Sequence, residues 1–332
     1  MPPPVRRLVR VLSCVALLAL ALAAAAAADN GGVAPPAPAS PEGQSIREIY
    51  WLILGITGGI FLLVATILIV FVVRYRSRGR PREAEGPQVR GHTNLELAWT
   101  AGPVIVLALI AGVVFWKVSD ITGTSGASTG STPNEQIRIE GRQFYWEFTY
   151  PGGAISVDHL RLPYNRAVRL EIEGEDVDHS WWVPALGGKL DAIPGRNNHL
   201  DLRPTKLGTF RGQCAEFCGL LHAAMFAEVE VLPADEYDAW ISRRKDDRAA
   251  LGRETFTGVC AKCHGLAGQG DIGPSIAGSG LLSDREGLAN VIRNGTGKMP
   301  AVGRDWPQEQ LDATIAYLRR RFGQGSGGGS QG

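Results

Sequence analysis

Two long uncharged segments, separated by a group of arginines, constrain the fold more than any other feature of this chain. The first covers residues 49–73 and the second residues 97–116, and neither contains Asp, Glu, Lys or Arg. Each has the length and composition of a helix that spans a bilayer core. Two buried helices of a soluble protein are the alternative, but the arginine-rich segment between the two runs favours a membrane hairpin. The sequence therefore predicts a transmembrane hairpin over residues 44–118.

The polar loop inside this hairpin indicates its orientation. Its basic residues are Arg74, Arg76, Arg78, Arg80, Arg82 and Arg90. Loops rich in Arg and Lys stay in the cytoplasm, so we expect everything after Lys117 to lie on the outer side.

Residues 1–28 have the pattern of a secretory signal peptide. Arg6, Arg7 and Arg10 precede an apolar run, and Ala26 to Ala28 supply small residues before Asp29. That order is typical of a signal with an A-x-A cleavage site. A lipoprotein anchored through Cys14 is the alternative, although almost no apolar segment precedes this cysteine.

The rest of the chain predicts two folded domains and a tail. Over residues 135–233, β-branched and aromatic residues alternate in short segments, which favours an all-β domain, either a β-sandwich or a Greek-key barrel; the segments are 136–150, 166–173, 209–213 and 225–232. Residues 248–322 predict an all-α domain, closed by an amphipathic helix over 308–322. Residues 323–332 predict a disordered Gly/Ser tail. The fold class is thus a multidomain membrane protein.

Composition excludes one class of partner. The formal net charge of the 332 residues is only +1. No basic stripe with interleaved aromatic residues is present, so we expect no nucleic-acid binding.

Sulfur-containing residues point to chemistry. Beyond residue 28 the chain holds only Cys214, Cys218, Cys260, Cys263, Met225 and Met299. All six stand at spacings typical of metal ligands, and no cysteine is left over for a structural disulfide.

The first group predicts a copper site. Cys214, Cys218, His222 and Met225 form C-x-x-x-C-x-x-x-H-x-x-M, and His179 lies upstream. Thiolate and imidazole select copper or zinc, and Met is a poor zinc ligand. Two thiolates from one turn are enough to bridge two copper ions, each with one histidine, with Met225 axial on one ion and a backbone carbonyl on the other. A Cys214–Cys218 disulfide is the alternative, but it would remove very little loop entropy.

The second group predicts covalent haem. Cys260, Cys263 and His264 form C-x-x-C-H, in which two thioethers hold a haem and the histidine takes one axial position. Met299 is the only methionine downstream and becomes the second axial ligand. A thioether opposite histidine leaves no open position, so this domain is expected to transfer electrons and to bind no O2.

Around the first group, His179 to Met225, the chain resembles subunit II of the haem-copper oxidases, that is, cytochrome c oxidase with its binuclear CuA centre. The resemblance covers residues 44–233 and is carried by segments 176–180, 182–184, 187–189, 191–196 and 212–219. It implies a cupredoxin-like Greek-key fold for residues 135–233. It also implies that Glu216 gives its backbone carbonyl to copper and its carboxylate to a Mg ion at the interface with subunit I.

The region around the C-x-x-C-H motif resembles class I cytochrome c. The whole order resembles the cytochrome-c-fused subunit II of caa-type terminal oxidases. This resemblance implies a bacterial inner-membrane protein whose haem c receives electrons from an external donor, such as a cytochrome c or a bc-type complex. The electrons then pass to CuA and on to subunit I, where O2 is reduced to water with proton translocation. Subunit III is a further expected partner, and no catalytic residue is expected in this chain.

One position on the second apolar segment has a special role in that family. The pattern Glu96, Trp99, Thr100 and Pro103 resembles the family's second helix and places Glu96 near the mouth of a proton path into subunit I. A carboxylate stabilised at a helix N-terminus is the alternative.

One departure concerns electron transfer from the donor. The family's aromatic run begins Gln-Trp-Tyr-Trp, and its first Trp receives electrons from a docked cytochrome c, whereas Phe144 follows Gln143 here. A fused donor has a high effective concentration at its acceptor, so we hypothesise that the fusion makes Phe144 tolerable.

Two other functions use similar residues. A nitric oxide reductase with a CuA subunit stays open, because the reacting metals lie in another polypeptide. A copper-delivery or electron-shuttle protein is the third hypothesis, but it would not need a covalent haem.

Overall fold

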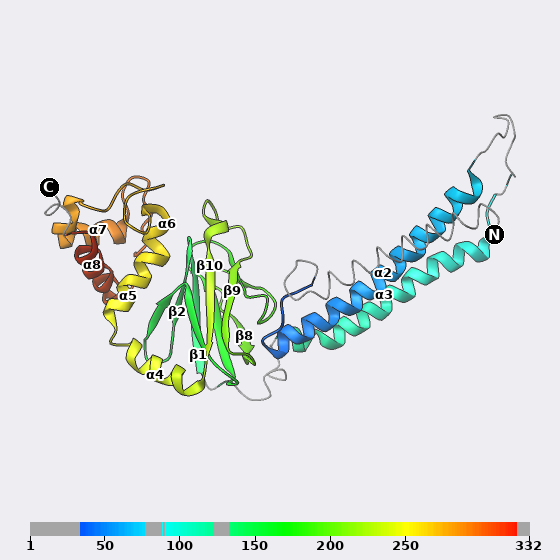
Figure 1. Ribbon diagram of the computed structural model, residues 1–332, viewed down its shortest axis with the longest axis horizontal. Helices are drawn as coiled ribbons and strands as arrows, with labels where there is room; N and C mark the ends of the chain where they lie inside the picture. The colour runs from blue at the N-terminus through cyan, green and yellow to red at the C-terminus, as the bar shows by residue number, and fades with distance from the viewer. Residues whose placement is uncertain (1–33, 77–87, 89, 123–132, 134, 324–332) are drawn as a thin grey trace, which may run out of the picture. The chain divides into compact units, whose positions relative to one another are not determined.

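The computed structural model describes residues 34–76, 88, 90–122, 133 and 135–323 (Figure 1). The signal peptide expected over residues 1–28 lies outside these residues, as do Arg78, Arg80, Arg82 and nearly all of the tail expected over 323–332. The chain divides into two compact units: the membrane hairpin, and a second unit that contains both the β domain and the C-terminal helices.

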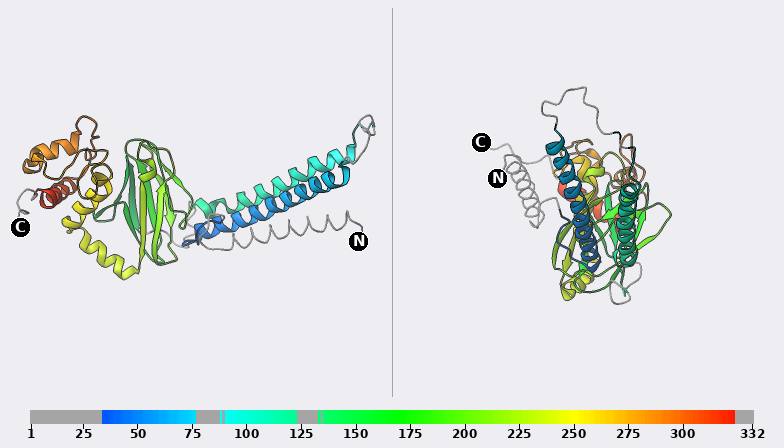
Figure 2. Two further views of the ribbon diagram at one scale, coloured as in Figure 1. Left: turned by 45° about the horizontal axis from the view of Figure 1, so that its top comes forward. Right: turned by 90° about the vertical axis from the view of Figure 1, so that its right-hand side faces the viewer.

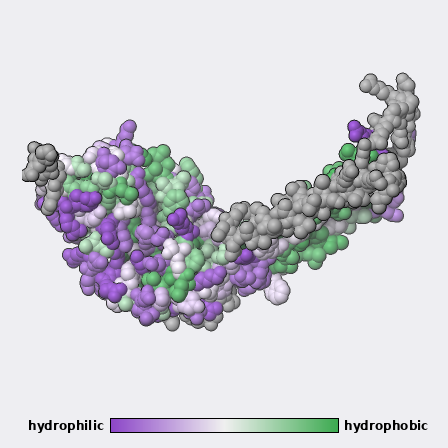
Figure 3. Space-filling model, in the orientation of Figure 1, coloured by the Kyte–Doolittle hydropathy of each residue, from purple (hydrophilic) through white to green (hydrophobic). Residues whose placement is uncertain are grey.

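The hairpin consists of α2 (Pro41–Tyr75) and α3 (Thr93–Thr122). Lys117 Nζ lies 2.9 Å from Glu48 Oε2, which ties the end of α3 to the beginning of α2 in an antiparallel pair (Figure 2). None of the most apolar part of either helix is buried, and Figure 3 shows hydrophobic residues on the hairpin surface. Lipid is the solvent that such exposed apolar helices require. The predicted pair of apolar helices is confirmed.

The β domain is a sandwich of two five-stranded sheets. One sheet has the order β3-β2-β1-β5-β8 and the other β4-β10-β9-β6-β7. The strands are β1 (Glu135–Arg142), β2 (Tyr145–Thr149), β3 (Ile155–Val157), β4 (His159–Pro163), β5 (Val168–Gly174), β6 (His179–Trp182), β7 (Leu190–Ala192), β8 (Asn198–Leu202), β9 (Gly208–Cys214) and β10 (Phe226–Leu232). Pairs β1·β5 and β4·β10 are parallel and the others antiparallel.

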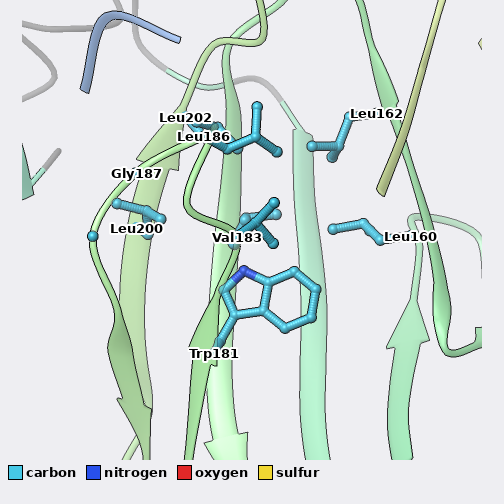
Figure 4. A pocket seen from close by; sticks show the side chains of 10 residues that line it. Leu160, Leu162, Trp181, Val183, Leu186, Gly187, Leu200 and Leu202 are labelled. Atoms are coloured by element: carbon cyan, nitrogen blue, oxygen red, sulfur yellow. The ribbon is translucent and has the colours of Figure 1, made fainter. Parts of the chain in front are cut away.

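Strand alternation places the sandwich core. In β5, the side chains of Val168, Leu170 and Ile172 are fully buried, while the residues between them are half-buried. This period of two is what a sheet covered on one face requires. Figure 4 shows leucines from both sheets and Trp181 lining a small pocket in the interior, and none of the expected metal ligands lines this pocket.

The strand expected over residues 136–150 is in fact two strands. Chain reversal at residues 143–144 pairs β1 with β2 in an antiparallel hairpin, in which Arg142 stands opposite Tyr145. Five strands, β3, β4, β6, β7 and β8, were not expected from the sequence. They have only three to five residues each, too few for a clear alternating pattern.

Helices follow the sandwich. They are α4 (Ala234–Arg244), α5 (Arg248–Thr255), η2 (Phe256–Cys260), α6 (Ala261–His264), η3 (Gly280–Ser283), α7 (Arg285–Asn294) and α8 (Gln308–Phe322). Asp247 caps α5 by accepting a hydrogen bond from Ala250 N at 2.9 Å. As expected for an amphipathic helix, α8 buries Leu311, Ile315 and Leu318.

Candidate metal centre and haem attachment site

Sheet pairing brings the candidate copper ligands to one end of the sandwich. His179 begins β6 and Cys214 ends β9, and these strands are antiparallel neighbours in which Trp181 stands opposite Cys214. Cys218 lies in the turn that follows β9. The next short helix, η1 (His222–Ala224), begins with His222, and Met225 directly precedes β10. All five side chains therefore come from the ends of strands or from the single turn between β9 and β10.

The donor atoms of these residues converge. Cys214 Sγ is 3.9 Å from Cys218 Sγ and 3.9 Å from His179 Nδ1. Cys218 Sγ is 3.5 Å from His222 Nδ1 and 3.8 Å from Met225 Sδ. The donors of His179, Cys214 and Cys218 all lie within 4.8 Å of one another.

These distances fit metal ions rather than a disulfide. Two ligands on one ion are at most two bond lengths apart, about 4.4 Å for nitrogen and sulfur donors. A disulfide needs its sulfurs about 2.05 Å apart, and both Cys214 and Cys218 are free thiols here. Soft thiolate and thioether donors beside imidazoles favour copper.

The two thiols differ in acidity. Burial raises the pKa of Cys214, but the opposing hydrogen bonds with His179 and with backbone groups prevail and hold it at about 6. Burial and the neighbouring Cys214 raise the pKa of Cys218 to about 12. At neutral pH one thiolate is therefore already present, and metal binding must release the proton of the other thiol.

Two residues brace the site from behind. His179 Nε2–H donates to Asp176 Oδ1 at 2.8 Å, which leaves Nδ1 facing Cys214. Asp176 also accepts a hydrogen bond of 2.6 Å from Gln143 N, and Gln143 Nε2 donates to the Cys218 carbonyl at 2.5 Å. Such outer partners fix the tautomer and orientation of metal-binding histidines.

The C-x-x-C-H motif spans the junction between η2 and α6. Cys260 and Cys263 are free and half-buried. His264 Nδ1–H donates to the Pro274 carbonyl at 2.6 Å, which leaves Nε2 as the atom able to bind iron. Gly273 allows this approach, because a Cβ there would lie 2.8 Å from the imidazole.

Met299 lies in a short turn between α7 and α8, where its backbone bridges Thr296. No hydrogen bond joins it to His264 among the described residues. The donor set of two thiols, an imidazole nitrogen and a thioether is the set that a covalently attached haem with two axial ligands requires.

Comparisons with known proteins agree along the chain. Residues 28–116 match the family model for the cytochrome c oxidase subunit II transmembrane domain, and residues 154–232 match that for its periplasmic domain. Residues 247–318 match the model for subunit III of cbb3-type cytochrome c oxidase. Cytochrome c oxidase subunit 2 of Alkalihalophilus pseudofirmus is 33% identical over 314 residues, which cover 85% of this chain and 89% of that protein. The chain belongs to the cytochrome c oxidase subunit 2 family.

Other relatives are similar over shorter stretches. Cytochrome c oxidase subunit 2 of Bacillus sp. strain PS3 is 30% identical, and the alignment covers 70% of this chain and 75% of that protein. The crystal structure of the periplasmic domain of cytochrome oxidase subunit II from Bradyrhizobium japonicum is 31% identical and covers 35% of this chain and 97% of that one, with a TM-score of 0.34. Membership in the cytochrome c oxidase subunit 2 family implies CuA copper in the sandwich and a partner subunit I. The separate match over residues 247–318 implies haem in the C-terminal domain.

The backbone carbonyl and the side-chain carboxylate of Glu216 have different neighbours. Its carbonyl oxygen lies 3.2 Å from Cys214 Sγ, inside the ligand cluster. Its carboxylate is about half exposed and lies 3.9 Å from Lys189 Nζ. In this subunit 2 protein the carbonyl and the carboxylate of Glu216 therefore have different neighbours, and their roles toward copper and Mg stay predictions.

Glu96 lies in the first turn of α3. Its Oε1 accepts a hydrogen bond of 3.1 Å from His92 N, the arrangement of a helix N-terminal cap. This contact favours the capping interpretation, and a proton-path role stays a prediction.

Sequence reasoning missed the outer residues of both sites. Asp176 stands in a segment that carries the family resemblance and Gln143 begins the aromatic run that departs from it, but no local pattern shows that the two residues meet. Lys262 lies inside the C-x-x-C-H motif, yet its ammonium group donates hydrogen bonds to Phe144 and Asp158 of the sandwich.

Proposed function

We propose that this chain is the electron-accepting subunit of a terminal cytochrome c oxidase. Cys260 and Cys263 attach haem c covalently, with His264 and Met299 as its axial ligands. The copper pair is held by His179, Cys214, the carbonyl of Glu216, Cys218, His222 and Met225. When both groups are bound, one electron at a time leaves the haem, enters the copper pair and continues to subunit I, where O2 is reduced to water with proton translocation.

The convergence of donors from separate elements carries this proposal. Two free thiols 3.9 Å apart, with an imidazole on each side, are the set that a binuclear copper pair needs. His179 is fully buried and Met225 is fully buried, so these residues exclude water and hold their donors in fixed positions. Fixed geometry keeps the rearrangement that accompanies electron transfer small.

The same proposal covers the surroundings of the chain. We place it as a two-pass protein of the bacterial inner membrane, with the sandwich and haem domain on the periplasmic side. Its partners are subunit I, subunit III and an external donor, either a cytochrome c or a bc-type complex. Glu216 contributes its carboxylate to Mg at the subunit I interface, and Glu96 lies at the beginning of a proton path.

Gas consumption by the detergent-solubilised complex tests the function. The complex receives electrons from ascorbate and a mediator, with O2 and NO offered separately. We expect rapid, cyanide-sensitive O2 uptake that is lost in Met225→Leu and His222→Ala. His199→Ala, which removes an exposed histidine away from the site, is the matched control and keeps the uptake.

The outcomes separate the hypotheses. NO reduction with negligible O2 uptake would move the chain to the nitric oxide reductase class. An electron paramagnetic resonance spectrum with one electron shared by two copper nuclei excludes a copper-delivery protein.

A further inference from the structure

The haem domain and the sandwich share a hydrophobic core. Tyr145 and Val157 belong to strands of the sandwich, but their side chains are buried among residues of the helical domain, including Phe256 and Trp306. At Gly258 the two domains approach so closely that a Cβ would lie 2.6 Å from Val157 Cγ1. Figure 1 shows α5 to α8 gathered on the side of the sandwich where β2 lies.

Lys262 connects the haem motif to this contact. It stands between Cys260 and Cys263, and its Nζ donates to the Phe144 carbonyl at 2.7 Å and to Asp158 Oδ2 at 2.6 Å. Only 17% of the Lys262 side chain and 15% of the Asp158 side chain are exposed. A buried ion pair with an additional hydrogen bond is satisfied only in one geometry, and removing one partner leaves an uncompensated charge.

Tyr145 contacts the segment around Met299, which is the second segment expected to hold the haem. Its side chain is 1% exposed. Its hydroxyl donates to the Val302 carbonyl at 3.2 Å and accepts from Trp306 Nε1 at 2.8 Å, both in the segment that follows Met299. Further along β2, Glu147 Oε2 accepts a hydrogen bond of 2.8 Å from Gln310 Nε2 on α8.

The same strand end also touches the copper ligands. Successive side chains of a strand point to opposite faces, so Trp146 points away from Tyr145. Its ring centroid lies 5.9 Å from that of His179, and its backbone N–H donates to Asp158 Oδ1 at 2.8 Å. On the preceding side of Tyr145, the Phe144 ring lies against Gly219, where a Cβ would be 3.2 Å away, directly after Cys218.

Residues 144–146 are therefore in contact with both haem-holding segments and with the copper ligand cluster. We propose that this strand end is a fixed docking element for the haem domain, and that Lys262 is a positioning residue that sets the haem against the copper pair. This inference rests on the proposed function for its electron-transfer role. The occupant of this surface is the chain's own haem domain, held permanently rather than visiting from a flexible tether.

A docked domain and a tethered domain differ in their response to salt. Exposed charges that steer a mobile partner are screened at high ionic strength, whereas buried pairs are screened much less. The partly buried Lys262–Asp158 pair therefore predicts interdomain electron transfer that is insensitive to salt.

Flash-induced electron injection into the haem of the loaded, detergent-solubilised complex measures this transfer. We expect equal rates at low and high ionic strength in the unmodified protein. Lys262→Met should slow haem-to-copper transfer at least about tenfold while the haem and copper spectra stay unchanged. Lys298→Met makes the same charge change one residue from Met299, at an exposed position, and should transfer at the unmodified rate.

Asp158→Asn is a second variant in case Lys262→Met does not accumulate with haem. Asparagine keeps an oxygen for the Trp146 backbone N–H but presents no charge to Lys262, so it should slow the transfer like Lys262→Met. Unmodified rates in both variants, or a rate that falls steeply with salt in the unmodified protein, would overturn the proposal.

Hydrogen exchange separates docking from electron transfer. In the unmodified protein the Trp146 amide and the amides of residues 256–264 should exchange slowly, and Lys262→Met but not Lys298→Met should accelerate them. Rapid exchange of both regions in the unmodified protein rules out fixed docking. Absence of any haem-to-copper transfer together with slow exchange would instead refute the proposed function and leave the docking contact standing.

Discussion

Glu140 and Glu147 stand opposite each other on β1 and β2, and both carboxyl groups are buried. Burial, followed by the charge of Glu147, raises the pKa of Glu140 to about 7 against the attraction of Arg142 and Arg138. Arg138 Nη2 lies 2.8 Å from Glu140 Oε1. Burial also raises the pKa of Glu147. Two buried carboxylates this close would repel each other, so one of the two groups keeps its proton well above pH 4.5.

This pair predicts a pH-dependent stability. Between pH 4.5 and about 7 the unfolded chain loses the Glu140 proton while the folded chain keeps it, so the free energy of unfolding falls as pH rises and levels off above pH 7. The glutamine of Glu140→Gln cannot ionise, so the decrease in the free energy of unfolding over this pH range should be smaller by about 2 kcal/mol. Chemical unfolding of the sandwich at about pH 5 and about pH 8, followed by tryptophan fluorescence, measures it. Glu171→Gln on β5 is the control for the charge change, and equal slopes in Glu140→Gln and the unmodified protein would contradict the prediction.

At the scale of elements, Gly258 allows the short helix η2 to pack closely against strand β3, because glycine has no side chain. Alanine at a helical glycine normally stabilises by about 1 kcal/mol. At Gly258 the added Cβ would meet Val157 Cγ1 at 2.6 Å, so the contact between η2 and β3 must open. Gly258→Ala should therefore destabilise the docked state, by about 1–3 kcal/mol.

Hydrogen exchange of residues 256–264 measures this effect. A Cβ added at Gly280 would meet no atom within 4 Å, so Gly280→Ala is the matched control in the same domain. Adding Val157→Ala to Gly258→Ala restores the space and should recover part of the lost protection. A Gly258→Ala variant as protected as the unmodified protein would mean that the two elements are not in fixed contact.

Elements with strong periodicity could be predicted from the sequence, and short ones could not. The uncharged runs predicted α2 and α3, and the apolar spacing of Leu311, Ile315 and Leu318 predicted α8. In the segment over 136–150 the apolar side chains fall on odd positions at Ile137 and Ile139 and on even positions from Trp146 onward. This change of phase accompanies the reversal at residues 143–144, and the prediction of a single segment did not take it into account. Strand β7 has only three residues and is held in place by pairing with β6.

The candidate site divides in the same way. Ligands close in sequence, such as Cys214 and Cys218, were readable from their spacing. His179 lies 35 residues before Cys214, and the structure brings it there through the β6·β9 pairing. Lys262 and Asp158 are 104 residues apart in sequence, and their contact depends on how two domains pack, which no local pattern carries.

At the scale of the whole molecule, the arginines between α2 and α3 predict a measurable orientation. Gln88 is exposed in the loop between the helices, and Lys206 is exposed on the sandwich. In right-side-out vesicles a membrane-impermeant thiol reagent should label Lys206→Cys and leave Gln88→Cys unlabelled, and inverted vesicles should give the reverse. Vesicles of the chain without an introduced cysteine supply the background. Labelling of both positions from one side would refute the two-pass hairpin.

Sheet pairing also sets the order of events while the chain is being made. Among the described strands of the second sheet, β4 pairs only with β10, and β10 ends at Leu232, about 70 residues later. The turn that carries Cys214, Cys218, His222 and Met225 is closed by the pairing of β9 with β10. A growing chain therefore holds no assembled ligand cluster until β10, the last strand of the sandwich, has been made and has paired with β9.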